Sequence, residues 1–329
     1  MKLHLIGCGG TGINEVHAFM GSLTEDYTGL PEILPRYVDT SDTNAKKKGI
    51  EKDVFIIHLP PEESGKEVRD GSGKKRTTHA PEIARRVPEV IADIGYNDAV
   101  VVVMSGGGGS GGTIGQYAMR ALQNEQRIVC GIIVNSFDDA QSRINCHDSM
   151  MTLEKMTTGT KMPSVVFAVD NEEGEKKSDE AIQNMLKILA VFLSGKNERL
   201  DTSDIAHFFN FPKVTPYTPR LAFMSAYVGM APEEIQALEP EAIAVASLYR
   251  DEVLKSPVNS EYSCHGLLDS NVISQDIKAV HLIISAQSVE EHFKALQKRV
   301  FEDEERRKKQ AKYVSFAKGV EGDDDMVIR

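Results

Sequence analysis

The chain has 329 residues, of which 41% are hydrophobic and 26% are charged, and it carries a formal net charge of -11. This length suits one large domain or two smaller packed domains. The acidic balance argues against direct nucleic-acid binding, which requires a basic face. No apolar run approaches the roughly 20 residues of a membrane span, and the N-terminus lacks the pattern of a signal peptide. We therefore expect a cytoplasmic protein without a membrane partner.

The four cysteines are Cys8, Cys130, Cys146 and Cys264. They are scattered along the chain and show neither the spacing of metal ligands nor that of a redox pair. We therefore expect reduced, mostly buried thiols and no metal site made by the protein itself.

Apolar, strand-like runs alternate with helical patterns through the first half of the chain. The predicted strands are Leu3–Ile6, Val54–Leu59, Ala99–Met104, Ile128–Val134 and Val165–Val169. The helical patterns between them include Ile13–Leu23, Ala80–Ile94 and Thr113–Asn124. This alternation predicts an α/β fold with a parallel sheet covered on both faces, in which ligands bind at the carboxyl ends of the strands.

The pattern changes at about residue 179. Apolar residues from Ile182 to Leu193 recur at helical spacing and form a wide face, which predicts a long buried helix. Beyond this helix we expect a smaller α/β domain with strands at Leu221–Val228 and Val280–Ser285 and a helix near Glu241–Leu254.

A highly charged helix, roughly Val289–Lys312, follows the second domain, and the chain ends in an acidic segment that we expect to be a disordered tail. The predicted organisation is a first domain over 1–178, a central helix over 179–200, a second domain over 201–286, a C-terminal helix over 287–313 and the tail over 314–329.

The segment LIGCGGTGINEV fits the pattern G-x-G-x-x-G with Gly7, Gly9 and Gly12. It follows a predicted strand and opens a helix, where backbone N–H groups and the helix dipole bind phosphate. On its own this loop also fits an NAD-dependent oxidoreductase, which would use Asp39 to hold the ribose. A tight turn with no ligand is the third interpretation.

A second glycine loop, Gly106–Gly112, also lies between a predicted strand and a predicted helix. Consecutive amides without side chains can surround anionic oxygens. Two such loops on neighbouring strand ends favour an extended phosphate chain, such as that of a nucleoside triphosphate, whereas a dehydrogenase needs only one. The nearest approach to a Walker A motif is GSGKKR, in which Lys75 replaces the required hydroxyl residue.

These segments resemble the nucleotide loops of the tubulin/FtsZ family. GCGGTGINEV is similar to the family's first loop, and GGGSG at Gly107–Gly111 resembles its signature phosphate loop, although Gly112 replaces the hydroxyl residue that follows. RLDTSD resembles the family's catalytic loop N-x-D-x-x-D, with Arg199 at the position of the Asn. The order of the segments also agrees, and the resemblance spans the whole chain. It is greatest to the phage-encoded tubulins.

The resemblance implies a tubulin/FtsZ-like fold with a GTPase domain, GTP and GDP with Mg2+ as ligands, and hydrolysis activated by assembly. It implies that the protein is its own partner, in head-to-tail filaments where the acidic tail docks on a neighbouring subunit. By similarity to the phage-encoded members, the filament would be a spindle that positions replicating phage DNA in the cytoplasm of the infected bacterium.

The resemblance also assigns residues to the nucleotide. Candidates for the base are Asn14, Asn171 and Asn184, and Asp138 is the candidate for the ribose. The phosphate loops and their neighbours supply the other candidates, which are Gly9, Gly10, Thr11, Gly12, Asp39, Thr40, Gly71, Ser72, Gly73, Gly107, Gly108, Gly109, Ser110, Gly111 and Gly112. Lys74 or Arg76 could offset phosphate charge, or could be solvated side chains of a basic loop.

Asp201 and Asp204 match the acidic positions of the catalytic loop. From their spacing alone, either could simply cap the helix that follows. The family match favours catalysis. Because the central helix separates them from the nucleotide loops by roughly 25–30 Å, they should act on the nucleotide of the next subunit. A non-hydrolysing, nucleotide-dependent filament protein stays open as an alternative, since Gly112 and Arg199 depart from the family pattern.

Overall fold

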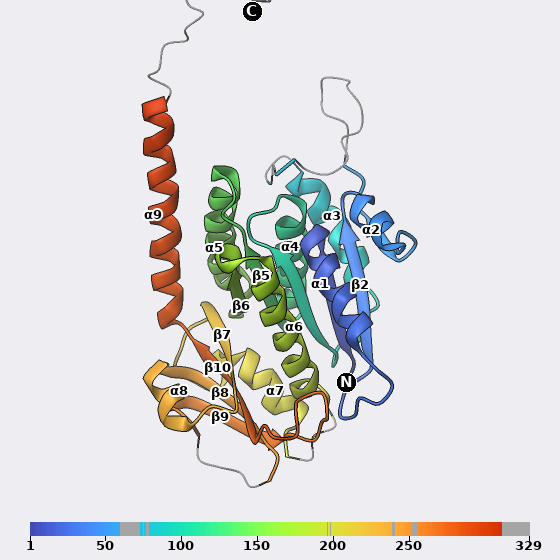
Figure 1. Cartoon of the computed structure of the whole chain (residues 1–329), viewed down its shortest axis with the longest axis vertical. Coiled ribbons are helices and arrows are strands. Elements are labelled where there is room, and N and C mark those ends of the chain that lie inside the picture. The colour runs from blue at the N-terminus through green and yellow to red at the C-terminus, as the bar shows by residue number, and fades with distance from the viewer. Residues whose placement is uncertain are drawn as a thin grey trace, which may run out of the picture.

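The computed structural model describes residues 1–59, 73–74, 76, 79–195, 197, 199–238, 241–251 and 256–310. Ten strands in this part of the chain form one mixed sheet in the order β3-β2-β1-β4-β5-β6-β7-β10-β8-β9 (Figure 1). The mostly parallel sheet and the C-terminal helix confirm the α/β fold predicted from the sequence.

The first six strands of the chain are all parallel. Their bounds are β1 Leu3–Cys8, β2 Ile33–Asp39, β3 Val54–Ile56, β4 Ala99–Ser105, β5 Ile128–Asn135 and β6 Ser164–Asp170. Their carboxyl ends therefore meet at one edge of the sheet, next to the starts of the helices that follow.

Helices cover both faces of this parallel part. The helices of the first half are α1 Gly9–Ser22, α2 Thr43–Lys48, α3 Ala80–Ile91, α4 Ser110–Asn124 and α5 Ala140–Thr160. Along β4, Val101 and Val103 belong to the cluster that contains α1, whereas Val100 and Val102 belong to the cluster of α3, α4 and α5. This alternation explains why the strand is apolar throughout, since each face of the sheet needs its own buried side chains.

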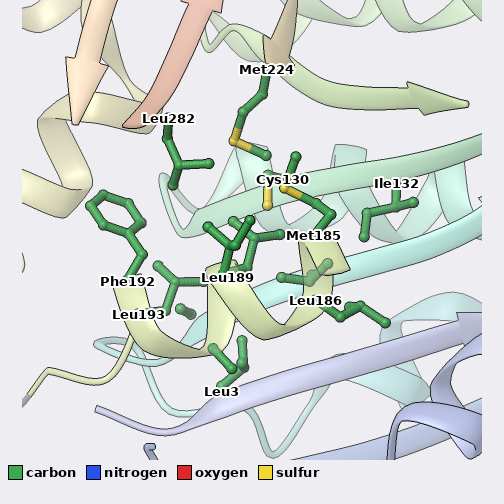
Figure 2. Packing of buried hydrophobic residues seen from close by; sticks show 14 of the residues in the cluster. Leu3, Cys130, Ile132, Met185, Leu186, Leu189, Phe192, Leu193, Met224 and Leu282 are labelled. Carbon is green, nitrogen blue, oxygen red and sulfur yellow. The ribbon is translucent and has the colours of Figure 1, made fainter. Parts of the chain in front are cut away.

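Helix α6, Glu175–Phe192, is the predicted central helix. It begins four residues before the expected start and ends well before residue 200. Figure 2 shows Leu189 of its apolar face among buried side chains from the first half of the chain, such as Leu3 and Cys130, and from the second half, such as Met224 and Leu282. One cluster of buried residues therefore joins both halves of the chain.

The second half contains α7 Thr202–Phe209, β7 Leu221–Val228, α8 Pro232–Leu238, β8 Ala242–Tyr249, β9 Ser260–Leu267 and β10 Ala279–Ser285. The predicted helix near Glu241–Leu254 is wrong, because Ala242–Tyr249 is a strand between β10 and β9. All eight of its residues are buried. A strand covered on both faces loses the apolar–polar alternation that identifies strands, and its alanines favoured the helical interpretation.

The C-terminal helix α9, Gln287–Gln310, runs beside α5 (Figure 1). Lys312, the expected end of this helix, and the acidic tail lie outside the described residues. Over the ranges that the structure describes, no helix combines the length and apolar character needed to span a membrane.

All four cysteines are free and buried, as the sequence predicts. Burial raises the pKa of each thiol, to about 12 for Cys130, Cys146 and Cys264.

Candidate nucleotide site

The two glycine loops lie at the ends of adjacent parallel strands, because β1 pairs with β4. Helix α1 begins at Gly9, directly after the strand residue Cys8. Helix α4 begins at Ser110, three residues before the predicted start, so Gly111 and Gly112 belong to its first turn. The first amides of both helices have no partner within their own helix, and two positive helix ends therefore meet at one place.

The backbones of the two loops are in direct contact. A Cβ atom added to Gly9 would lie 2.7 Å from the Cα of Gly111, and one added to Gly111 would lie 2.5 Å from the carbonyl oxygen of Cys8. An added Cβ on Gly12 would lie 2.3 Å from the carbonyl oxygen of Val103. Several glycines are therefore required by loop-to-loop packing.

Gly112 is the position where the family pattern has a hydroxyl residue. A Cβ atom there would lie 2.6 Å from the carbonyl oxygen of Ser105. The close approach of α4 to the end of β4 thus excludes a side chain, which gives this departure from the pattern a physical reason.

Thr40, after β2, contacts Ser110 at the second glycine loop, with their hydroxyl oxygens 2.5 Å apart. Asp39 is buried and accepts a hydrogen bond from the backbone N–H of Thr40 at 2.7 Å. Gly108 donates its N–H to Ser105 Oγ at 3.0 Å. The turn after β2 therefore lies next to the two glycine loops.

Gly71 and Ser72 lie outside the described residues, whereas Gly73, Lys74 and Arg76 are described. Lys74 forms an ion pair with Asp139, which lowers the pKa of that carboxyl to about 2, and donates to Ser142 Oγ at 2.8 Å.

Arg76 donates to the carbonyl oxygen of Asn145 at 2.8 Å and to Gln116 Oε1 and Ser149 Oγ at 2.6 Å. Ser149 Oγ in turn donates to the carbonyl oxygen of Gly106 at 2.9 Å. Arg76 therefore uses its guanidinium to bind α4 and α5 next to the glycine loop.

The candidates for the ribose and base lie on separate elements. Asp138, after β5, accepts from Ser136 Oγ at 2.7 Å. Asn171, after β6, has a buried side-chain oxygen with no partner among the described residues. Asn14 and Asn184 are exposed on α1 and α6, two helices that contact each other.

Glu15 is a site-adjacent residue that sequence reasoning missed. It is buried between α1 and α6 and accepts from Gln183 Nε2 at 2.8 Å. Burial raises the pKa of its carboxyl to about 7, and the nearby Asp179 adds to the shift. A carboxyl between Ile13 and Val16, on the apolar side of the helix, is the signal that could have identified it.

Asp201 and Asp204 form a capping box at the start of α7. The backbone N–H of Asp204 donates to Asp201 Oδ1 at 2.8 Å, and the backbone N–H of Asp201 donates to Asp204 Oδ2 at 3.2 Å. Tyr262 Oη donates to Asp204 Oδ1 at 3.2 Å. Capping, the alternative left open by the sequence, is therefore the local role of this pair. Asp201 is nevertheless exposed.

Figure 1 places α7 at the end of the molecule opposite to the starts of α1 and α4. The 18 residues of α6 span about 27 Å between these ends. The fold therefore brings the glycine loops, Thr40, Asp138 and Asn171 to one edge of the sheet, and leaves Asp201 and Asp204 far from all of them.

A groove of about 880 Å³ lies between α4 and α5, and Gly73, Lys74 and Arg76 also line it. Most of the charged residues that line the groove are basic. The basic residues are Lys74, Arg76, Arg120 and Lys155, and the acidic residue is Asp148. Within the described ranges, no group of three or more His, Cys, Asp or Glu side chains is arranged to hold a metal ion.

The residues at the edge fit a nucleotide in two respects. Close packing excludes side chains where the two glycine loops meet, and the side-chain oxygen of Asn171, at the end of β6 on the same edge of the sheet, has no partner among the described residues.

No family model matches the chain. A phage tubulin-like protein of Pseudomonas phage phiKZ is 29% identical over 311 residues, which cover 91% of this chain and 89% of the relative. A protofilament of TubZ from bacteriophage PhiKZ matches with a TM-score of 0.80 and 24% identity, covering 99% of this chain and 98% of TubZ. The phage tubulin PhuZ with GDP matches with a TM-score of 0.79 and 21% identity, covering 99% and 97%.

The chain therefore has the tubulin-like fold of these phage proteins, with its glycine loops at one end of α6. In sequence, the chain is similar to the phage tubulin-like protein of phage phiKZ along 91% of its length.

Proposed function

We propose that this protein binds a guanine nucleotide, assembles head to tail into filaments, and hydrolyses GTP at the junction between subunits. The observation that carries the proposal is the separation of the glycine loops from Asp201 and Asp204 by the length of α6. A subunit with this geometry cannot bring its own acidic pair to its own nucleotide. A second subunit stacked on the first could.

Similar proteins support both parts of the proposal. PhuZ has been solved with GDP, and TubZ of Bacillus thuringiensis serovar israelensis as a GTPγS-form protofilament with a TM-score of 0.62. TubZ of PhiKZ and PhuZ201 have been solved as a protofilament and a filament.

In the proposed site, the amides of Gly9–Gly12 and Gly107–Gly112 bind the phosphates, together with Thr40 and Gly71–Gly73. Asp138 holds the ribose, and Asn14, Asn171 and Asn184 contact the base. Mg2+ bound with the triphosphate would neutralise charge on its oxygens. Asp201 and Asp204 of the next subunit orient or deprotonate the attacking water.

The proposed biological role is a spindle that positions replicating phage DNA in the cytoplasm of an infected bacterium. The relative from phage phiKZ is the support for a viral setting. The acidic tail, which lies outside the described residues, would dock on a neighbouring subunit, and the basic groove between α4 and α5 offers it a surface of opposite charge.

One mixing experiment tests the proposal against its rivals. The protein is incubated with GTP, ATP, GTPγS or NAD while light scattering and phosphate release are recorded together. We expect scattering with GTP and GTPγS, and phosphate only with GTP. Scattering without phosphate would indicate a non-hydrolysing filament protein. Neither signal with any nucleotide, together with NAD binding in a parallel titration, would indicate an oxidoreductase.

A further inference from the structure

One face of α9 carries a stripe of side chains directed at the body of the protein. His292, Leu296, Arg299 and Asp303 follow one another at spacings of four, three and four residues, which place them on one side of a helix. Leu296 is 2% exposed and Asp303 6% exposed. Two charged residues of the stripe thus lie against the protein, whereas Glu290, Lys294, Lys298 and Glu302 of the same helix are exposed.

Arg299 contacts two loops at the carboxyl ends of the parallel strands, the edge that also carries the glycine loops. Its guanidinium forms an ion pair with Glu172, which follows β6, and lies 4.3 Å from the centre of the Phe137 ring, which follows β5. Glu172 is the neighbour of Asn171, and Phe137 is the neighbour of Asp138. A single side chain of α9 therefore bridges the loop of a base candidate and the loop of the ribose candidate.

Asp303 is connected to the same loop through Arg143. Its carboxylate forms an ion pair with Arg143 of α5, with Nη2 and Oδ1 3.2 Å apart. The other Nη of Arg143 donates to the backbone carbonyl of Phe137. Phe137 is thus fixed through its ring by Arg299 and through its carbonyl by Arg143.

His292 adds a third connection, at the strand ends themselves. Its Nε2 lies 3.2 Å from Asn135 Nδ2, which donates to Asp170 Oδ1 at 3.0 Å. Asn135 and Asp170 are the last residues of β5 and β6. Contacts from successive turns of α9 therefore reach the ends of the two strands and the loops that follow them.

We propose that Arg299 is a positioning residue, which holds the loops after β5 and β6 in the arrangement that binds the nucleoside. This inference rests on the proposed function, because it takes Asp138 and Asn171 as nucleotide contacts. An exposed ion pair contributes little to stability by itself. The planar guanidinium instead fixes two loops relative to each other, so its loss should reduce ligand affinity more than overall stability.

Coupling of this kind is reciprocal. If α9 favours the nucleotide-binding arrangement of the loops, bound nucleotide must equally favour the docked position of α9. The helix that leads into the C-terminal tail would then respond to the occupancy of the nucleotide site.

The test measures GDP and GTP affinity by equilibrium titration, below the protein concentration at which scattering begins. We expect Arg299→Ala to bind about 5- to 20-fold more weakly, while its melting temperature without nucleotide stays within a few degrees of the wild type. Arg299→Lys should restore only part of the affinity, since an ammonium keeps the charge but not the planar stacking. Lys298→Ala, on the exposed side of the same turn, is the matched control and should bind as the wild type.

Glu172→Gln provides a second route if Arg299→Ala fails to fold. It should weaken binding in the same direction, and the double variant should lose less than the product of the two single effects. Failure of the wild type to bind any guanine nucleotide would overturn the proposed function. Normal binding by the wild type and equal affinity in Arg299→Ala would overturn only the role of Arg299.

Discussion

Cys8 and Gly111 lie so close that a Cβ atom on Gly111 would be 2.5 Å from the carbonyl oxygen of Cys8. Residues more than 100 positions apart in sequence therefore meet backbone to backbone, where the first turn of α4 crosses the end of β1. The two glycine loops form one surface only because no side chain intervenes between them.

Gly111→Ala should separate the loops. We expect a loss of about 1–3 kcal/mol of unfolding free energy, as for an overpacked core position, and at least a tenfold loss of nucleotide affinity. Thermal unfolding and nucleotide titration measure the two effects. Gly21→Ala is the control, because no atom lies within 4 Å of its added methyl group and α1 should gain about 0.5–1 kcal/mol. Equal behaviour of the two variants would contradict the packing argument.

Asp204→Asn tests catalysis between subunits without removing the helix cap. The amide oxygen can still accept the N–H of Asp201, so the variant should fold and polymerise normally. It should lose most phosphate release, by a factor of about 10²–10⁴. Filaments mixed from wild-type and variant subunits provide a further test. Their rate of phosphate release should fall as the fraction of variant subunits rises. A normal rate in pure Asp204→Asn filaments would assign the pair to capping alone.

Deletion of residues 317–329 should raise the critical concentration for assembly, because it removes the acidic tail that we propose to dock on the neighbouring subunit. Arg120→Glu, in the groove between α4 and α5, should have the same effect on the full-length chain. Lys47→Glu on α2 changes the net charge equally and serves as the control. Sedimentation across a concentration series measures the threshold, and an unchanged value in both test variants removes the tail from the mechanism.

Glu15→Gln should stabilise the protein above neutral pH. The carboxyl has an ordinary pKa of 4.5 but a folded-state pKa of about 7, so between these values the folded protein keeps a proton that the unfolded chain has lost. Stability contributed by this group is complete below pH 4.5 and is lost as the pH rises through 7. The glutamine side chain does not titrate. At pH 8 the free energy of unfolding of the variant should therefore exceed that of the wild type by on the order of 1–3 kcal/mol. Denaturant unfolding at pH 5 and pH 8 would show the difference, and an equal gain at both values would contradict the assignment.

His281 gives the opposite pH dependence. It is buried beside Ser247, with Nδ1 2.8 Å from the hydroxyl oxygen, and burial lowers its pKa from 6.5 to about 4. The unfolded chain takes up a proton in this interval and the folded chain does not, so stability falls as the pH drops from 6.5 to 4, by about 3 kcal/mol. His281→Gln should flatten this part of the profile. A slope that survives the substitution would assign the effect to other groups, such as His4 and His292, whose pKa values burial also lowers.

Strands with strong apolar runs, such as Ala99–Met104 and Ile128–Val134, could be predicted from sequence because burial on both faces leaves no polar positions. For Ala242–Tyr249 the prediction was wrong, because a fully buried strand shows no alternation and its alanines favour a helical interpretation. The starts of α1 and α4 also differed, since glycines are poor helix formers and their helical first turns are set by tertiary packing.

The candidate site, too, could be predicted only in part from the sequence. Glycine loops are visible as motifs, and the sequence order places them on strand ends. Glu15, the Arg299 bridge and the Thr40–Ser110 contact depend on elements that meet only in three dimensions. Periodicity carries no information about such pairs.

The burial of every native cysteine has a practical consequence for observing this protein at work. Thiolates are the species that react with maleimide dyes, and these four thiols are both inaccessible and held in the protonated form. A cysteine substituted for Lys298 would be the single reactive handle on the chain. Fluorophores attached there could report the motions of α9 during a nucleotide cycle, with the natural sulfur atoms left in place.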